Sequence, residues 1–163
     1  MSSYNRRRAV LILAAFAAGC GFQPVYGPGG SAEGLRGTIG FDTPRDLEGF
    51  ALVRQLEDRL GLADAPSYRL SARIFTDEQE LGVTPDQVIT RYNLRGRVEF
   101  VLLDETTGRV ATSGQVASFT SYSATGTPFA TRTAREDATE RLMVILADQI
   151  VSRLLVTAGE WRR

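Results

Sequence analysis

An alternating stretch near the middle of the chain constrains the fold more than any other feature. Between Val88 and Leu102 the even positions include the apolar Tyr92, Leu94, Val98 and Phe100, and the odd positions include the polar Arg91, Asn93, Arg95, Arg97 and Glu99. Successive side chains of a strand point to opposite faces of a sheet, so this pattern predicts a long strand with one buried face. The chain therefore needs a layer that covers only one face of its sheet.

Three other segments are predicted strands. Apolar residues at Tyr68, Leu70, Ala72 and Ile74 alternate with polar ones, which predicts a half-buried strand. The turn-forming run 104–108 joins the long strand to a return strand from Arg109 to about Tyr122. A short strand is expected at 35–41, weakened by its two glycines.

Two segments have helical periodicity. In the first, Thr43 is the expected N-cap, Pro44 the first helical residue and Asp46 the acid of a capping box. Its apolar residues Leu47, Phe50, Val53, Leu56 and Leu60 follow helical spacing, and Gly61 is the expected stop. The second runs from about Phe129 to Thr157, with a buried stripe at Ala134, Ala138, Leu142, Ile145, Leu146, Ile150 and Leu154.

The order of these elements predicts the fold class. Strand, helix, three strands and helix favour an α+β fold, a two-layer sandwich in which a mainly antiparallel four-stranded sheet carries two helices packed on one face. The other face of the sheet stays uncovered, and Arg91, Arg95 and Arg97 are expected to point from it.

The N-terminal segment is typical of a bacterial lipoprotein export signal. Three arginines (6–8) precede an apolar run (9–18) and then Cys20, the chain's one cysteine. The run is shorter than the ~20 residues that span a bilayer. We expect residues 1–19 to be cleaved, Cys20 to carry S-diacylglycerol and N-acyl (palmitate) chains, 20–34 to form a lipidated flexible tether, and 35–163 to form a single domain.

Two details bear on the export route and the destination. An ordinary cleaved signal with an incidental cysteine is the alternative, and Arg7-Arg8 loosely resembles a twin-arginine signal. Gly21 follows the cysteine, where an aspartate would favour inner-membrane retention, so the outer membrane is the expected location.

Composition excludes several kinds of function. The chain has no histidine, which removes Ser-His-Asp and Cys-His catalysis and the commonest metal ligand. It has 19 basic and 19 acidic residues, and three of the basic ones leave with residues 1–19, so the mature chain carries a net charge of −3 and is not expected to bind nucleic acid. Asp77, Glu78 and Glu80 could serve a glycosidase or a hard metal, but a solvated strand end beside the predicted turn at 84–86 explains them as well. We expect no enzyme, cofactor or metal.

The three arginines are the candidate binding residues. Guanidinium groups at Arg91, Arg95 and Arg97 could bind phosphates of a lipid head group, and Phe119 and Val101 would add apolar contact for an amphiphile or a protein partner. The alternative is cross-strand pairing with Glu99 or other acids on a face that merely has to be wet.

The segment Cys20-Gly21-Phe22-Gln23-Pro24-Val25-Tyr26-Gly27 resembles the start of the mature LPS-assembly lipoprotein LptE family, which opens with Cys-Gly-Phe, then a proline, an aliphatic residue and Tyr-Gly. The order of elements is similar too. The resemblance implies a non-enzymatic outer-membrane lipoprotein, lipid-anchored at Cys20 and facing the periplasm or a barrel lumen. Such a protein partners and plugs the LptD β-barrel, assists its assembly and contacts lipopolysaccharide. The family motif supplies no lipopolysaccharide-contacting residue, so the three arginines depend on strand geometry alone.

Two other functions remain open from the sequence. An auxiliary lipoprotein of a phospholipid or solvent-tolerance ABC transport system would also place a small α+β domain on a lipid tether. A lipid-anchored hydrolase is the third, and the missing histidine weighs against it.

Overall fold

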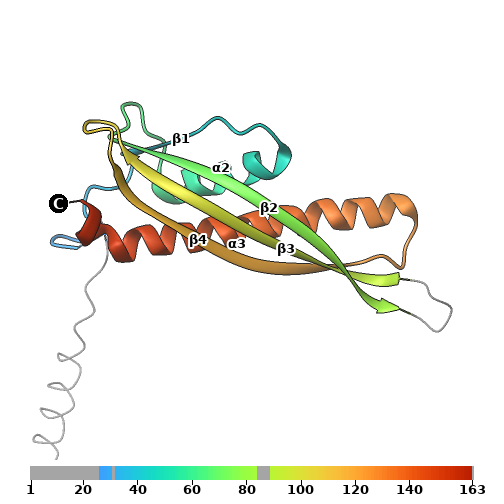
Figure 1. Ribbon diagram of the computed structural model, residues 1–163. Coiled ribbons are helices and arrows are strands. Elements are labelled where there is room, and N and C mark those ends of the chain that lie inside the picture. The colour runs from blue at the N-terminus through green and yellow to red at the C-terminus, as the bar shows by residue number, and fades with distance from the viewer. Residues whose placement is uncertain (1–25, 31, 84–88, 163) are drawn as a thin grey trace, which may run out of the picture.

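The computed structural model describes residues 26–30, 32–83 and 89–162, so Cys20, the predicted signal and the predicted turn at 84–86 lie outside the described residues. The elements are β1 (Ile39–Phe41), α2 (Leu47–Leu60), β2 (Tyr68–Val83), β3 (Ile89–Asp104), β4 (Val110–Ser123) and α3 (Pro128–Trp161) (Figure 1). This is the predicted order of elements.

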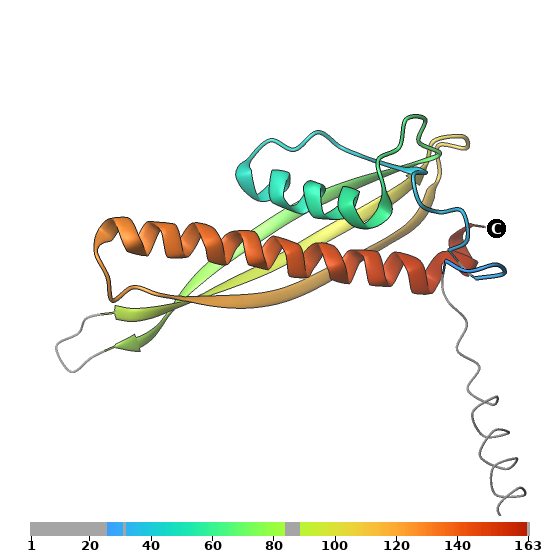
Figure 2. The same ribbon diagram turned by 180° about the vertical axis from the view of Figure 1, so that it is seen from behind.

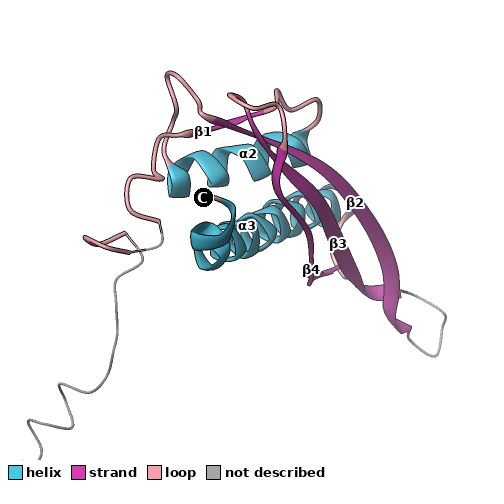
Figure 3. Ribbon diagram, turned by 60° about the vertical axis from the view of Figure 1, so that its left-hand side comes forward, coloured by secondary structure: helices cyan, strands magenta, loops and turns pink. Residues whose placement is uncertain are grey.

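The strands form one sheet in the order β1-β2-β3-β4. The β2–β3 and β3–β4 pairs are antiparallel, and the short β1 runs parallel to β2. Both helices lie on the same face of the sheet, and α3 follows almost its whole length (Figures 2 and 3). The predicted α+β sandwich with two helices on one face is confirmed.

The core lies between the sheet and the two helices. The even residues Leu94, Val98, Phe100 and Leu102 of β3 are buried, as predicted. From α3 they meet a buried stripe that includes Leu142, Leu146, Ile150 and Leu154, while the predicted member Ile145 is partly exposed. By length and composition α3 could cross a membrane, but 44% of its most apolar window is buried inside the domain, so its apolar stripe is explained by packing on the sheet.

The predicted start of α2 was wrong. The helix begins at Leu47, and Asp46 is its N-cap, with Oδ1 accepting a hydrogen bond from the Gly49 N–H (2.7 Å). Asp46 is as good a cap as Thr43, and residues 42–45 carry the chain from the sheet to the helix layer instead. Gly61 ends the helix with φ +83°, as expected.

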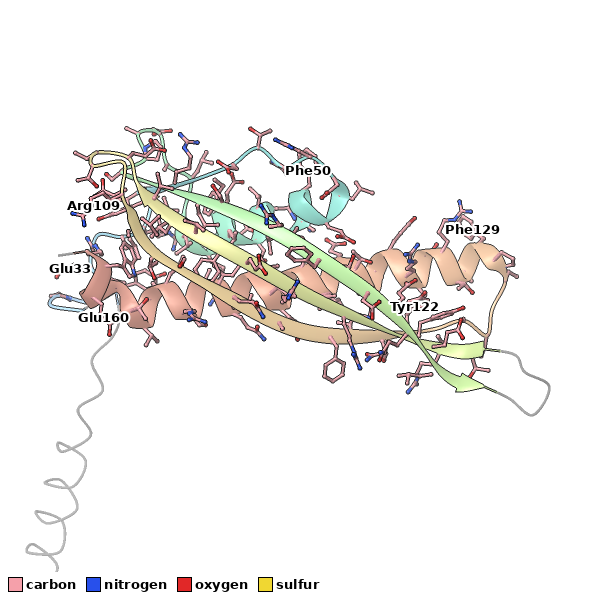
Figure 4. The ribbon with its side chains drawn as sticks, in the orientation of Figure 1. Glu33, Phe50, Arg109, Tyr122, Phe129 and Glu160 are labelled. Atoms are coloured by element: carbon pink, nitrogen blue, oxygen red, sulfur yellow. The ribbon has the colours of Figure 1, made fainter. Side chains whose placement is uncertain are left out.

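The predicted buried stripe of α2 was only partly right. Leu56 and Leu60 are buried as predicted and Val53 is half-buried, whereas Leu47 and Phe50 are 84% and 57% exposed. Leu52, which was not part of the predicted stripe, is buried instead. Phe50 belongs to the first turn of α2 (Figure 4). That turn therefore presents apolar surface to solvent.

Strand β2 is longer than the sequence pattern indicated. It continues through Asp77, Glu78 and Glu80 to Val83, so these acids do not lie at a strand end. In register they face Arg95, Leu94 and Tyr92 of β3, and β3 holds them in the sheet.

The α3 helix likewise begins one residue earlier and ends four residues later than predicted, with Thr127 as its N-cap.

Candidate functional site

The candidate site is the face of the sheet that neither α2 nor α3 covers (Figure 3). Strand register places two rows across it: Asp77–Arg95–Phe119 and Phe75–Arg97–Ala117. Arg91 lies further along the same face, between Leu81 and Ser123. All three predicted arginines are exposed, and the alternation of β3 puts them on this side.

The two rows enclose a shallow hollow of about 490 Å³. It is lined by Phe75, Thr76, Asp77, Arg95, Gly96, Arg97, Ala117, Ser118 and Phe119. Phe119 is 67% exposed and Phe75 is 39% exposed, so two aromatic rings lie beside two guanidinium groups in water. Aromatic rings and arginine together suit a ligand with an apolar part and an anionic part.

The three arginines differ in the contacts that their guanidinium groups make within the protein. The Arg97 guanidinium lies over the Phe75 ring, with Cζ 4.5 Å from the centroid, and its Nη2 is 3.9 Å from Glu99 Oε1. An exposed pair at that distance contributes little. Within the part of the chain that the structure describes, Arg91 and Arg95 form no ion pair. Of the three arginines, only Arg97 therefore pairs with Glu99 in the described structure, and the other two are left to contact a ligand.

A second polar cluster lies on the helix-covered face, near the end of the sheet where α3 begins (Figure 4). Glu78 Oε1 accepts hydrogen bonds from the Tyr122 hydroxyl (2.9 Å) and from Arg135 Nε (2.8 Å). The Tyr122 ring stacks on Tyr92, with centroids 5.2 Å apart. Burial, followed by the hydrogen bond to Glu78, raises the pKa of Tyr122 to about 12.

This cluster joins β2, β4 and α3, and sequence reasoning missed it. Part of this cluster could have been found from strand alternation. Glu78 and Tyr122 occupy even positions, and even positions share the core-facing side of the sheet with Leu94. Glu78 is thus engaged in holding the domain together. Among the residues that the structure describes, no three histidine, cysteine, aspartate or glutamate side chains are grouped so that they could hold a metal ion.

The fold is that of a class of small bacterial lipoprotein domains whose structures are solved. A candidate lipoprotein from Caulobacter crescentus CB15 has a TM-score of 0.67 and 26% identity, covering 82% of this chain and 99% of that one. Rare lipoprotein B from Shewanella oneidensis has a TM-score of 0.60 and 18% identity, covering 77% of this chain and 98% of that one. A minor lipoprotein from Acinetobacter baumannii has a TM-score of 0.55 and 20% identity, covering 73% of this chain and 89% of that one. Both share the fold. No curated protein matches the chain.

The chain belongs to the LptE lipopolysaccharide-assembly family, which it matches over residues 38–154. That match excludes Cys20–Gly27, so it supports the family independently of the residues that first indicated it. The protein is a lipopolysaccharide-assembly lipoprotein of a non-enzymatic family.

Proposed function

We propose that this lipoprotein is anchored in the outer membrane through acylated Cys20, partners and plugs an LptD β-barrel, assists the assembly of that barrel, and contacts lipopolysaccharide as it is inserted. Residues 1–19 are the cleaved signal, 20–34 the tether and 35–163 the working domain. The observation that carries the lipopolysaccharide part is the uncovered sheet face, which combines Arg91, Arg95 and Arg97 with two exposed phenylalanines.

The chemistry of this face fits an anionic amphiphile. Guanidinium groups bind phosphate with charge-assisted, often bidentate hydrogen bonds, and Arg91 and Arg95 have no ion pair within the described residues that would compete. Phe75 and Phe119 give an acyl chain or sugar ring a surface to pack on. A lumen plug also needs polar surface, and β4 turns Ser113, Gln115, Ser121 and Ser123 to solvent.

The first experiment tests the partner. Tagged full-length protein is isolated from detergent-solubilised outer membranes, and the proteins that come with it are identified and quantified. We expect one large β-barrel protein in stoichiometric amount, and untagged cells as control should give none. Recovery of ABC-transporter subunits, or of the protein alone, would overturn the barrel assignment in favour of an auxiliary transport lipoprotein.

The second experiment tests the arginine face. Replacing Arg91, Arg95 and Arg97 together by aspartate should weaken lipopolysaccharide binding in vitro at least about tenfold, because each lost contact is a charge-assisted one. Thermal unfolding should change little, since all three side chains are exposed. If the aspartates disturb the strand, the triple glutamine variant keeps the strand polar and still removes the charges.

A matched control separates the site from net charge. Aspartates at Arg45, Arg109 and Arg132, which are exposed and do not line the hollow, change the charge by the same amount. Binding should survive in this control. Equal losses in both triple variants would mean that only the overall charge matters, and unchanged binding in the first would refute the arginine face.

A further inference from the structure

The two edges of the sheet differ in whether side chains cover their backbone groups. On β4, the outer edge is capped by arginine side chains of α3: Arg153 Nη1 donates to the Gln115 carbonyl oxygen (3.2 Å) and Arg141 Nη2 to that of Ser121 (3.5 Å). Such blocking is how proteins keep an edge strand from pairing with another chain. The opposite edge, on β2, has no comparable cap among the described residues.

Strand β1 pairs with only the first part of β2. The Tyr68 N–H donates to the Thr38 carbonyl oxygen (3.1 Å), and the Asp42 N–H donates to that of Leu70 (3.2 Å). The β2–β3 register runs without a shift, so the backbone groups of every second residue beyond Leu70 face the same edge. These residues are Ala72, Ile74, Thr76, Glu78 and Glu80, and the described part of the chain makes no hydrogen bond to their edge-facing backbone groups.

A trough lies along this open edge. After Asp42 the chain leaves the sheet and runs past β2 without pairing until it reaches α2 (Figures 1 and 3). The connection 41–46, one side of α2 and the start of β2 bound a space of about 720 Å³. Its lining is mixed: Phe41, Val53 and Ile74 are apolar, whereas Asp42 and Arg45 of the connection are charged. Along β2 it extends only as far as Ile74. The space suits one extended segment. A second whole sheet would meet the connection 41–46, which lies on the outer side of the space, before its edge reached β2.

The side chains on the other face of β2 define what that segment should carry. Arg73 and Asp77 flank Phe75 there, and neither forms an ion pair within the described residues. A strand laid beside them is best matched when an acid faces Arg73 and a base faces Asp77. On the trough side, the residues that lie beside Ala72 and Ile74 should be apolar.

We propose that the β2 edge from Ala72 to Glu80 is a strand-addition site for an extended segment of a partner protein, with apolar residues beside Ala72 and Ile74 and with an acidic and a basic residue four positions apart. Main-chain hydrogen bonds supply the affinity in this mode of recognition, and the alternate side chains supply the specificity. The site goes beyond the proposed function, because it uses the sheet edge and requires no lipopolysaccharide.

The test uses a capped peptide, Val-Lys-Val-Thr-Val-Glu-Val, added to the full chain, with amide hydrogen exchange followed residue by residue. The edge-facing amides of Ala72, Ile74, Thr76 and Glu78 should exchange at least about tenfold more slowly with saturating peptide. The amides of Arg73, Phe75 and Asp77 already face β3 and should not change. This pattern reports backbone pairing, which a purely electrostatic contact would not produce.

Two peptide controls and one variant keep the proposal falsifiable. N-methylation of one alternate set of peptide residues should abolish binding, and N-methylation of the other set should not, because only one set faces β2. Thr76→Pro removes an edge-facing N–H without removing a β2–β3 bond, so it should also block binding. If that variant fails to fold, the two N-methylated peptides still decide.

Three results would overturn the proposal. Binding of both N-methylated peptides would show that the backbone is not involved. Failure to protect the edge amides would show that the edge is closed. Protection that appears when the protein alone is concentrated would make a second copy of this chain the occupant. None of these results affects the lipopolysaccharide-binding experiment. The strand-addition site and the arginine face can therefore be refuted separately.

Discussion

Phe100→Ala is expected to lower the free energy of unfolding by about 3–5 kcal/mol. Phe100 is 1% exposed and is among the largest fully buried side chains of the core. Its truncation removes apolar contact and leaves a cavity that the close-packed surroundings fill only in part. Because a domain is stable by about 5–15 kcal/mol, the variant should be close to unfolding, and urea denaturation followed by circular dichroism measures the shift.

The matched control is Phe119→Ala. Phe119 lies on the neighbouring strand but on the uncovered face, and it is 67% exposed. The same truncation there should change the free energy of unfolding by no more than about 0.5 kcal/mol. If the two variants lost equal stability, the assignment of the two faces would be wrong.

The two faces could be predicted because strand alternation is a local signal. Arg91, Arg95 and Arg97 lie on the face opposite Leu94 and Val98 whatever the partners of β3 are. The start of α2 could not be predicted in the same way. Thr43 and Asp46 both have side chains that cap helices, and the path from β1 to the helix layer decides between them.

The hollow on the uncovered face depends on information that one strand does not contain. Phe75 lies under Arg97 because β2 pairs with β3 in the register Tyr68–Asp104, which alternation alone leaves undetermined. The same holds for Glu78, which reaches Tyr122 and Arg135 from 44 and 57 positions away in the chain. Sequence reasoning found the arginines and Phe119 but had no means to find Phe75, their aromatic neighbour on β2.

Gly96→Val gives a second large effect and decides between two physical arguments. In a strand, valine is preferred over glycine, so local propensity predicts that the variant is more stable by several tenths of a kcal/mol. Packing predicts the reverse. A Cβ at position 96 would lie 2.8 Å from Leu146 Cδ1 and 2.9 Å from Leu142 Cδ2, and both leucines are fully buried.

Packing should dominate, because the fully buried side chains of Leu142 and Leu146 have to shift to make room in a close-packed core. We expect Gly96→Val to lower the free energy of unfolding by about 1–3 kcal/mol, measured by urea denaturation. Ala117→Val is the control: it enlarges an exposed side chain opposite Arg97 on the uncovered face and should be nearly neutral. A more stable Gly96→Val variant would show that Leu142 and Leu146 do not restrict this position, and it would remove the reason for a glycine in the middle of that strand.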